Sequence, residues 1–318
     1  MHASRQTALL EGTSMGTTWS MRLGCGHAPD TLGPTTQAVL DRIVDQMSTW
    51  DADSAITRLN HAPRGWYQIP DEFFEVLQAA LGAAEESRGA YDPTLGRLTS
   101  LWGFGPEGSV QAPPEEAEIA RALASGGWRK TALNTEHRGV WQPGGLHFDL
   151  SSIAKGYGVD AMGQVLDEHG ITDYLVELGG ELKARGHNAE GLDWIVEIES
   201  PVPHTDGLPV ALRDCAIATS GEYRRHIWHK GRRYGHTLDP RSGRPVAHAL
   251  ESVSVLHDSC MLADALATAL QSMGPRLGLQ HAREHGIAAV FMIRSRPDDL
   301  AVEWTAPFQE RAQGRRPA

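Results

Sequence analysis

Residues 173–186 read DYLVELGGELKARG, and this stretch indicates what kind of sheet the chain builds. Two strand-like runs, 174–178 and 181–184, flank the pair Gly179-Gly180. Two glycines between such runs are typical of a hairpin turn, which makes its two strands antiparallel neighbours. The absence of side chains would equally let a ligand approach the backbone there. The residues alone leave both interpretations open.

The other strand patterns also come mostly in runs, with helical patterns between the runs. Strands are predicted as a pair over 8–24, near 131–140 and 146–150, at 173–178 and 181–186, as several short pieces over 193–256, and last at 287–293. Helices are predicted over 35–48, 71–87, 115–125, 153–168, 259–272 and 275–285. This order predicts an α+β fold with mixed or antiparallel sheets and packed helices. It is not a Rossmann fold, because no strand is followed by a glycine-rich dinucleotide fingerprint.

Composition places the chain among ordinary globular enzymes, with 318 residues, 41% hydrophobic and 22% charged. We expect one domain over 1–308, with 106–117 as the candidate boundary between two lobes and 309–318 as a flexible basic tail. The net charge of −11 argues against a nucleic-acid partner. A phosphate ligand would therefore need a small local site, with a cation to offset the negative field.

Three cysteines, Cys25, Cys215 and Cys260, are widely spaced and form no CxxC pair, which argues against a disulfide framework and a zinc site. The amino terminus lacks an apolar signal core. No run approaches the roughly 18–20 apolar residues of a transmembrane helix. We therefore expect a cytoplasmic protein without a membrane span, or an exported form whose signal has been removed.

Residues 147–157, HFDLSSIAKGY, combine a strand end with a helix start. Two serines after Asp149 can cap a helix, and Lys155 falls in its first turn. Backbone N–H groups at a helix start suit an anion, and lysine adds a compact charge for phosphate. The alternative is a plain N-cap with a solvated lysine, although a cation is unfavourable at that end of a helix.

Asp264 and Thr268 stand four residues apart in the helical pattern LADALATAL, away from its leucine stripe. A carboxylate and a hydroxyl so aligned suit Mg²⁺, which uses few protein ligands and takes water and phosphate for the rest. The alternative is a polar face on which two residues happen to align.

His236 lies in YGHTLDP, where a strand ends in a turn. Histidine is the side chain best suited to accept a proton near neutral pH. The alternative is a structural histidine, since one histidine in a strand is a weak signal.

Taken together and in this order, the segments resemble the ApbE family of FAD:protein FMN transferases. The resemblance spans Gly12 to Met273 and rests on these segments: TSMGT at 13–17; STW, DS and LN at 48–50, 53–54 and 59–60; YDPTLG and LWGFG at 91–96 and 101–105; 149–160; 177–186; HTLDP and SG within 235–243; and 263–268. It implies a T-fold-related architecture.

The resemblance also implies the site residues. Those that would contact FAD are Met15 and Trp50 at the isoalloxazine ring, Ala90, Tyr91 and Asp92 at the adenosine end, Asp149, Lys155 at the phosphates, Gly179, Gly180 and Thr237. Those that would hold Mg²⁺ are Ser152, Asp264 and Thr268. His236 would be the catalytic base.

The implied reaction is attack by a threonine or serine hydroxyl of an acceptor flavoprotein on the FMN-side phosphorus of FAD, with AMP leaving. Membrane redox subunits are the implied acceptors, and an exported form whose signal has been removed would be periplasmic and associated with the inner membrane. The chain departs from the family pattern at Glu181, where many members have Asp or Asn, and in lacking a lipobox cysteine. Two alternatives remain: a magnesium-dependent FAD pyrophosphatase, and a non-catalytic FAD-binding maturation protein.

Overall fold

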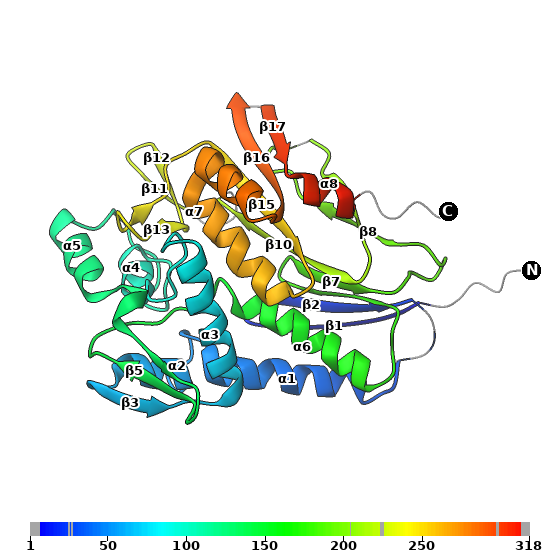
Figure 1. Cartoon of the computed structure of the whole chain (residues 1–318), viewed down its shortest axis with the longest axis horizontal. Helices are drawn as coiled ribbons and strands as arrows, with labels where there is room; N and C mark the ends of the chain where they lie inside the picture. Colours follow the sequence, from blue (N-terminus) through cyan, green and yellow to red (C-terminus); the bar gives the residue numbers. More distant parts are fainter. Residues whose placement is uncertain are drawn as a thin grey trace, which may run out of the picture.

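The computed structural model describes residues 7–24, 26, 28–203, 205–222, 226–296 and 299–312. An eight-stranded antiparallel sheet, in the order β1-β2-β6-β7-β10-β15-β16-β17, runs through its centre (Figure 1). The strands are β1 Ala8–Ser14, β2 Thr17–Leu23, β6 Tyr174–Leu178, β7 Glu181–Arg185, β10 Cys215–Gly221, β15 Leu250–His257, β16 Ala288–Arg296 and β17 Asp299–Trp304.

Both faces of this sheet are buried over most of its length, because successive side chains of a strand point to opposite faces. In β6, Leu175 packs on one face and Val176 on the other. In β15, Val255 and Leu256 divide in the same way. The central strands therefore bury apolar side chains on both faces of the sheet.

Helices cover one face of the sheet. They are α1 Leu32–Met47, α6 Ala154–Glu168 and α7 Cys260–Glu284, and α3 Asp71–Glu86 packs on α1 and α7. Helices α6 and α7 pack against each other as well as against the sheet, and Figure 1 shows the start of α7 lying over α6. The opposite face is covered by the hairpin of β8 Trp194–Ile198 and β9 Leu208–Leu212, together with α8 Ala306–Ala312.

Smaller elements flank this body. One group packs around Trp102 and Phe104 and contains α4 Gly96–Leu101, α5 Glu116–Ser125 and the paired strands β11 His226–His229, β12 Arg232–Gly235, β13 Leu238–Asp239 and β14 Arg244–Pro245. The other contains α2 Ala55–His61, the short helix η1 Trp128–Lys130, and a small sheet of β3 Gly65–Gln68, β5 Gly139–Gln142 and β4 Leu133–Asn134.

The predicted α+β class with antiparallel sheets is confirmed. The predicted hairpin at residues 174–185 is confirmed too, since Leu178 pairs with Glu181 across a two-residue turn. Gly179 and Gly180 have φ angles of 62° and 103°, in the region that favours glycine.

The predicted strand at 146–150 is wrong, although its alternating apolar side chains are buried. Its backbone pairs with loops, and only an isolated bridge joins His147 to Leu95. The side chain of Asn60 accepts from Phe148 N (2.7 Å) and donates to Phe148 O (2.9 Å). Asp149 N donates to Pro93 O at 2.8 Å. An amide side chain and a loop thus take the place of a neighbouring strand.

The predicted chain end is also wrong, because the strand at 288–296 is followed by β17 and α8 rather than being the last element. Helix α8 includes the first four residues of the predicted tail, and 313–318 lie outside the described residues. The two helices predicted over 259–285 form one run, α7, with a break at Gly274 before Pro275. Elements α2, α4 and β3 were not predicted.

None of the helices in the described part of the chain combines the length and apolar content that a bilayer crossing requires. Cys25, considered above for its place in the chain, lies outside the described residues. The single-domain boundaries stay a prediction.

Candidate functional site at the junction of α6 and α7

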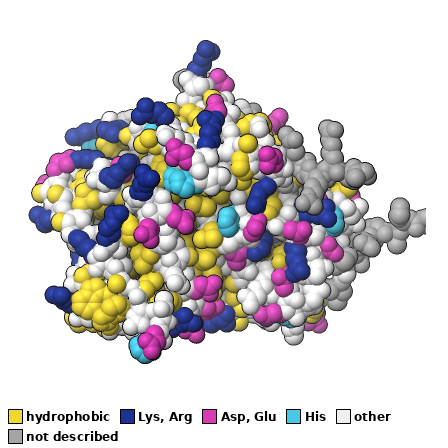
Figure 2. All heavy atoms as spheres, viewed as in Figure 1, with side chains coloured by type: hydrophobic (Ala, Val, Ile, Leu, Met, Phe, Trp, Pro, Cys, Tyr) yellow, Lys and Arg dark blue, Asp and Glu magenta, His cyan; other side chains and the backbone are white. Residues whose placement is uncertain are grey.

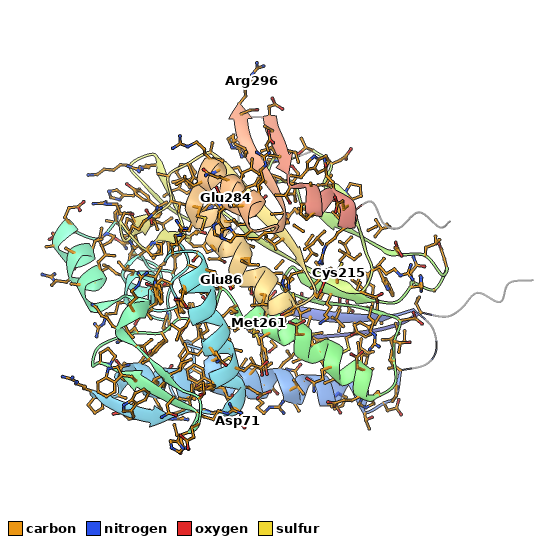
Figure 3. The ribbon with its side chains drawn as sticks, viewed as in Figure 1. Asp71, Glu86, Cys215, Met261, Glu284 and Arg296 are labelled. Carbon is orange, nitrogen blue, oxygen red and sulfur yellow. The ribbon has the colours of Figure 1, made fainter. Side chains whose placement is uncertain are left out.

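The start of α6 meets the first two turns of α7. Gly156 N–H donates to Asp264 Oδ2 at 3.1 Å. A side chain at Gly156 would overlap the carbonyl oxygen of Cys260 and lie 2.8 Å from the Cα of Met261. Glycine therefore lets the two helices approach closely, and Figure 3 shows Met261 at this junction.

Asp160, one turn further along α6, holds the start of α7. Its carboxylate accepts hydrogen bonds from Ser259 Oγ (2.8 Å), Cys260 N (3.1 Å) and Met261 N (3.0 Å), and from Lys183 Nζ (2.6 Å). A carboxylate at a helix start satisfies N–H groups that have no partner within the helix. The position of Asp264 on α7 is thus set from α6.

Lys155 points toward β7, where Glu181 follows the Gly179-Gly180 turn. The ammonium Nζ lies 2.6 Å from Glu181 Oε2, and the Glu181 side chain is only 2% exposed. The Lys155 side chain keeps 30% of its surface exposed. Lys155, which the sequence predicts to bind phosphate, therefore has a buried carboxylate partner and still reaches solvent.

The electrostatics of this cluster favour a cation. Burial raises the pKa of Glu181 to about 7, with Lys155 lowering it and Asp264 raising it further. Burial also raises the pKa of Asp264, which Lys155 and the Gly156 N–H only partly offset. Burial opposes the charge of Lys155, but Glu181 and Asp264 outweigh it and raise the pKa of the lysine. A divalent cation bound here would favour the charged forms of both carboxylates.

The donor set around Asp264 fits Mg²⁺ in kind. Thr268 Oγ1 lies 2.9 Å from Ser220 Oγ, and Ser152 Oγ donates to Tyr91 Oη at 3.3 Å. One carboxylate with hydroxyl oxygens suits a hard cation that keeps water and phosphate in its shell. The described residues contain no cluster of three or more His, Cys, Asp or Glu side chains able to hold a metal, so a site made by protein carboxylates alone is not supported there.

Tyr91 forms one wall of the cluster. Burial, with the negative charges of Asp264 and Asp149, raises the pKa of Tyr91 well above its ordinary value, so its hydroxyl stays neutral. Ala90 is 7% exposed and Tyr91 2%. Asp149 lies partly exposed at the helix start, where its Oδ1 accepts from Ser151 N at 3.0 Å.

Asp92 accepts hydrogen bonds on both of its carboxylate oxygens. Its Oδ1 accepts from Thr94 N (2.9 Å) and Thr94 Oγ1 (2.6 Å), and its Oδ2 accepts from Trp128 N (3.2 Å). Both oxygens brace the loop that carries Tyr91, and burial raises the pKa of the Asp92 carboxyl. The predicted contact of Asp92 with adenosine stays a prediction.

Met15 and Trp50 occupy two separate loops. Met15 has φ 50° in the β1–β2 turn, and a Cβ built on Gly158 of α6 would lie 3.3 Å from its Cε atom. Trp50 follows α1, and 60% of its surface is exposed. A thioether and an exposed indole are groups on which a flat ring can lie.

His236 sits between β12 and β13, with its ring 6.2 Å from that of Phe104 at an interplanar angle of 70°. Thr237 is 8% exposed, and its N–H donates to Glu222 Oε1 at 3.2 Å. Glu222, a buried carboxyl directly after β10, was not predicted from the sequence. No spacing rule joins residue 222 to residue 236, so only a pairing of distant strands reveals it.

A cavity of about 510 Å³ opens beside this turn. Tyr234 and Asp239, on either side of His236, line it together with Ser272, which stands one helical turn after Thr268. Arg232, Arg241 and Arg244 also line it. Figure 2 shows Lys and Arg side chains gathered on the side of the molecule where α5 and β11–β13 lie. A cavity of this size is within the usual range for small ligands, about 300–1,000 Å³.

The fold and site define a class: an α+β protein in which the start of α6 meets α7 and brings a lysine–glutamate ion pair close to a buried aspartate. The ApbE family model matches residues 15–291. A Vibrio cholerae relative named FAD:protein FMN transferase is 35% identical, covering 90% of this chain and 87% of its own length. The Escherichia coli protein of that name is 34% identical, with 96% and 89% covered.

Solved structures agree. The apo form of the flavinyl transferase ApbE from Pseudomonas stutzeri superimposes with a TM-score of 0.90 and 35% identity, covering 98% of each chain. The chain therefore belongs to the ApbE family, and the resemblance inferred from its motifs is confirmed.

Proposed function

We propose that this chain transfers the FMN half of FAD to a threonine or serine hydroxyl of an acceptor flavoprotein, with Mg²⁺ present and AMP as the leaving group. The names of the relatives support the coarse reaction. The observation that carries the chemistry is the contact of Gly156 N with Asp264 beside Lys155, which brings an anion site and a cation site together.

Lys155 and the first N–H groups of α6 would face the pyrophosphate of FAD. An ammonium has three donors, so Lys155 can serve Glu181 and a phosphate oxygen together. Asp264, Thr268 and Ser152 would hold Mg²⁺, which when bound neutralises charge on the pyrophosphate. In this proposal the metal also stabilises the charged forms of the two buried carboxylates.

The rest of FAD would extend on both sides of this centre. The proposed contacts to the isoalloxazine ring are Met15 and Trp50. Ala90, Tyr91 and Asp92 would meet the adenosine end, and Thr237 would also contact FAD. Asp149 would accept from the nucleotide, and the side-chain-free turn Gly179-Gly180 would let the cofactor approach the backbone. The N–H of Gly180 already donates to Glu177 Oε1 at 2.9 Å. In this proposal the turn therefore packs closely against FAD and donates no hydrogen bond to it.

In the proposed step, the acceptor oxygen forms a bond to the FMN-side phosphorus and the bond from that phosphorus to the AMP oxygen breaks. His236 takes the proton of the attacking hydroxyl, and AMP leaves with the electron pair of the broken bond. Positioning and electrostatics supply most of the rate in such reactions. The resemblance favours a membrane redox subunit as acceptor.

The test combines the protein, FAD, Mg²⁺ and a candidate acceptor domain, and follows AMP release and acceptor mass. One FMN added to the acceptor for each AMP supports transfer. AMP with free FMN and unmodified acceptor would instead establish a pyrophosphatase. Binding of FAD without release of AMP would instead indicate a non-catalytic FAD-binding protein.

Asp264→Ala tests the metal site, and we expect it to abolish Mg²⁺-dependent turnover. Asp167→Ala is the matched control, because Asp167 is an exposed acid near the end of α6, where it pairs with Arg185 of β7. Full activity of the Asp264 variant would remove it from the proposed ligand set. Equal loss in both variants would mean that the assay reports general damage.

A further inference from the structure

Glu222 lies directly after β10 and only 6% of it is exposed. Its Oε1 accepts from Thr237 N at 3.2 Å, and the Thr237 hydroxyl hydrogen-bonds the same carboxyl. Its other oxygen lies against Gly235. The carboxyl therefore touches both chain neighbours of His236.

Gly235 shows how tight this contact is. A Cβ built on Gly235 would overlap Glu222 Oε2 and lie 2.5 Å from its Cδ atom. The φ of Gly235 is not in the left-handed region, so its backbone conformation would accept other residues. Glycine is needed here to make room for the carboxyl of Glu222.

The same strand end also reaches α7. Ser220, two residues before Glu222, pairs with Thr268 at 2.9 Å. Glu222 N donates to Glu251 O at 3.0 Å, which fixes its backbone to β15. Residues 220–222, at the end of β10 and directly after it, thus contact a proposed metal ligand and the turn that carries the proposed base.

We propose that Glu222 is a positioning residue for His236. Its carboxyl accepts a hydrogen bond from Thr237 and fills the space against Gly235. These two contacts, called the clasp below, fix the direction of the imidazole between them. This inference rests on the proposed function for its kinetic consequence, and on the geometry alone for its structural one. A shift of about 1 Å in a catalytic group costs up to roughly a hundredfold in rate.

The clasp needs an oxygen acceptor and a filled volume rather than a negative charge. Burial raises the pKa of Glu222 to about 7, with Thr237 and Arg233 lowering it and Glu251 raising it. A carboxylate, a carboxylic acid and an amide all keep an oxygen for the Thr237 N–H. Glutamine should therefore replace Glu222, and alanine should not.

We expect Glu222→Ala to lower kcat for AMP release by about tenfold or more per folded molecule, with KM for FAD changed much less. Glu222→Gln should restore most of kcat. Gly235→Ala should lower kcat as Glu222→Ala does, since its methyl displaces the carboxyl. In the double variant the two losses should not add, because either change alone breaks the clasp.

A readout independent of activity is the imidazole ¹⁵N spectrum, with the His236 signal assigned from His236→Gln. We expect this signal to move in Glu222→Ala and Gly235→Ala and to stay in Glu222→Gln. Glu251→Gln is the matched control, because Glu251 is an equally buried carboxylate that pairs with Arg233 and Arg294 instead.

An unchanged His236 signal in Glu222→Ala would overturn the inference whether or not the wild type releases AMP. An equal loss of kcat in Glu222→Gln and Glu222→Ala would also overturn it, because the charge of Glu222 would then matter and not the clasp. If the wild type releases no AMP while the His236 signal moves as expected, the proposed function fails and the positioning contact stands.

Discussion

Replacing Gly156 by alanine tests whether the closeness of α6 and α7 matters to the site. The added methyl would overlap Cys260 O and lie 2.7 Å from its carbonyl carbon, so backbone rather than a flexible side chain must move. Overpacking of this kind costs about 1–3 kcal/mol. Alanine in a helix regains about 0.5–1 kcal/mol relative to glycine. We therefore expect a net loss of about 1–2 kcal/mol in the free energy of unfolding.

The effect on activity should be larger than the effect on stability. The bond from Gly156 N to Asp264 is 3.1 Å long, so a separation of the helices by even half an ångström breaks it. Asp264 then loses a hydrogen bond that favours its charged form. We expect kcat for AMP release to fall about tenfold to a hundredfold, and the Mg²⁺-dependent rise in Tm to shrink.

Gly82→Ala is the matched control, because Gly82 is also inside a helix and a Cβ there would meet nothing within 4 Å. This variant should gain about 0.5–1 kcal/mol and keep full activity. Urea unfolding and AMP release, measured on both variants, decide the outcome. A Gly156 variant that gains stability like the control and keeps its rate would refute the close contact.

Three further changes follow from the geometry. Asp160→Ala removes four hydrogen bonds, three of them at the start of α7, and should cost about 2 kcal/mol in urea unfolding and weaken Mg²⁺ binding measured by calorimetry. Asn60→Ala leaves Phe148 N and O buried without their partner and should cost about 2–4 kcal/mol, again by urea unfolding; an unchanged midpoint would contradict the pairing. The pKa of Glu222 is raised from 4.5 to about 7, so its contribution favours folding below pH 4.5 and is lost as pH rises through 7. The free energy of unfolding of Glu222→Gln minus that of the wild type should therefore be larger at pH 8 than at pH 4, by on the order of 3 kcal/mol. If unfolding stability depends on pH in the same way in both proteins, the pKa shift is contradicted.

Local patterns predicted the parts of the fold that local physics decides. The Gly179-Gly180 turn and its strands follow from backbone freedom and side-chain alternation, and the four-residue spacing of Asp264 and Thr268 follows from helix geometry. Helix starts at residues 116 and 154 were predicted within one or two positions.

The failures share one cause. Residues 146–150 alternate like a strand, yet their hydrogen-bond partners are Asn60 and loop backbone from distant parts of the chain. Residues 299–304 form β17 because β16 offers an edge on which they can pair. Alternation reports which side chains are buried; it does not report what the backbone bonds to.

The candidate site, like the fold, has features that the sequence predicts and features that only the tertiary structure reveals. The sequence determined by itself the kinds of group available: a lysine at a helix start, a carboxylate and hydroxyl one turn apart, a histidine in a turn, and the motif order that marks the ApbE family. Only the tertiary structure decided which groups share a charge environment. Lys155 meets Glu181, Gly156 meets Asp264, and Glu222 meets the neighbours of His236, because helix packing and strand pairing bring together residues 13 to 108 positions apart.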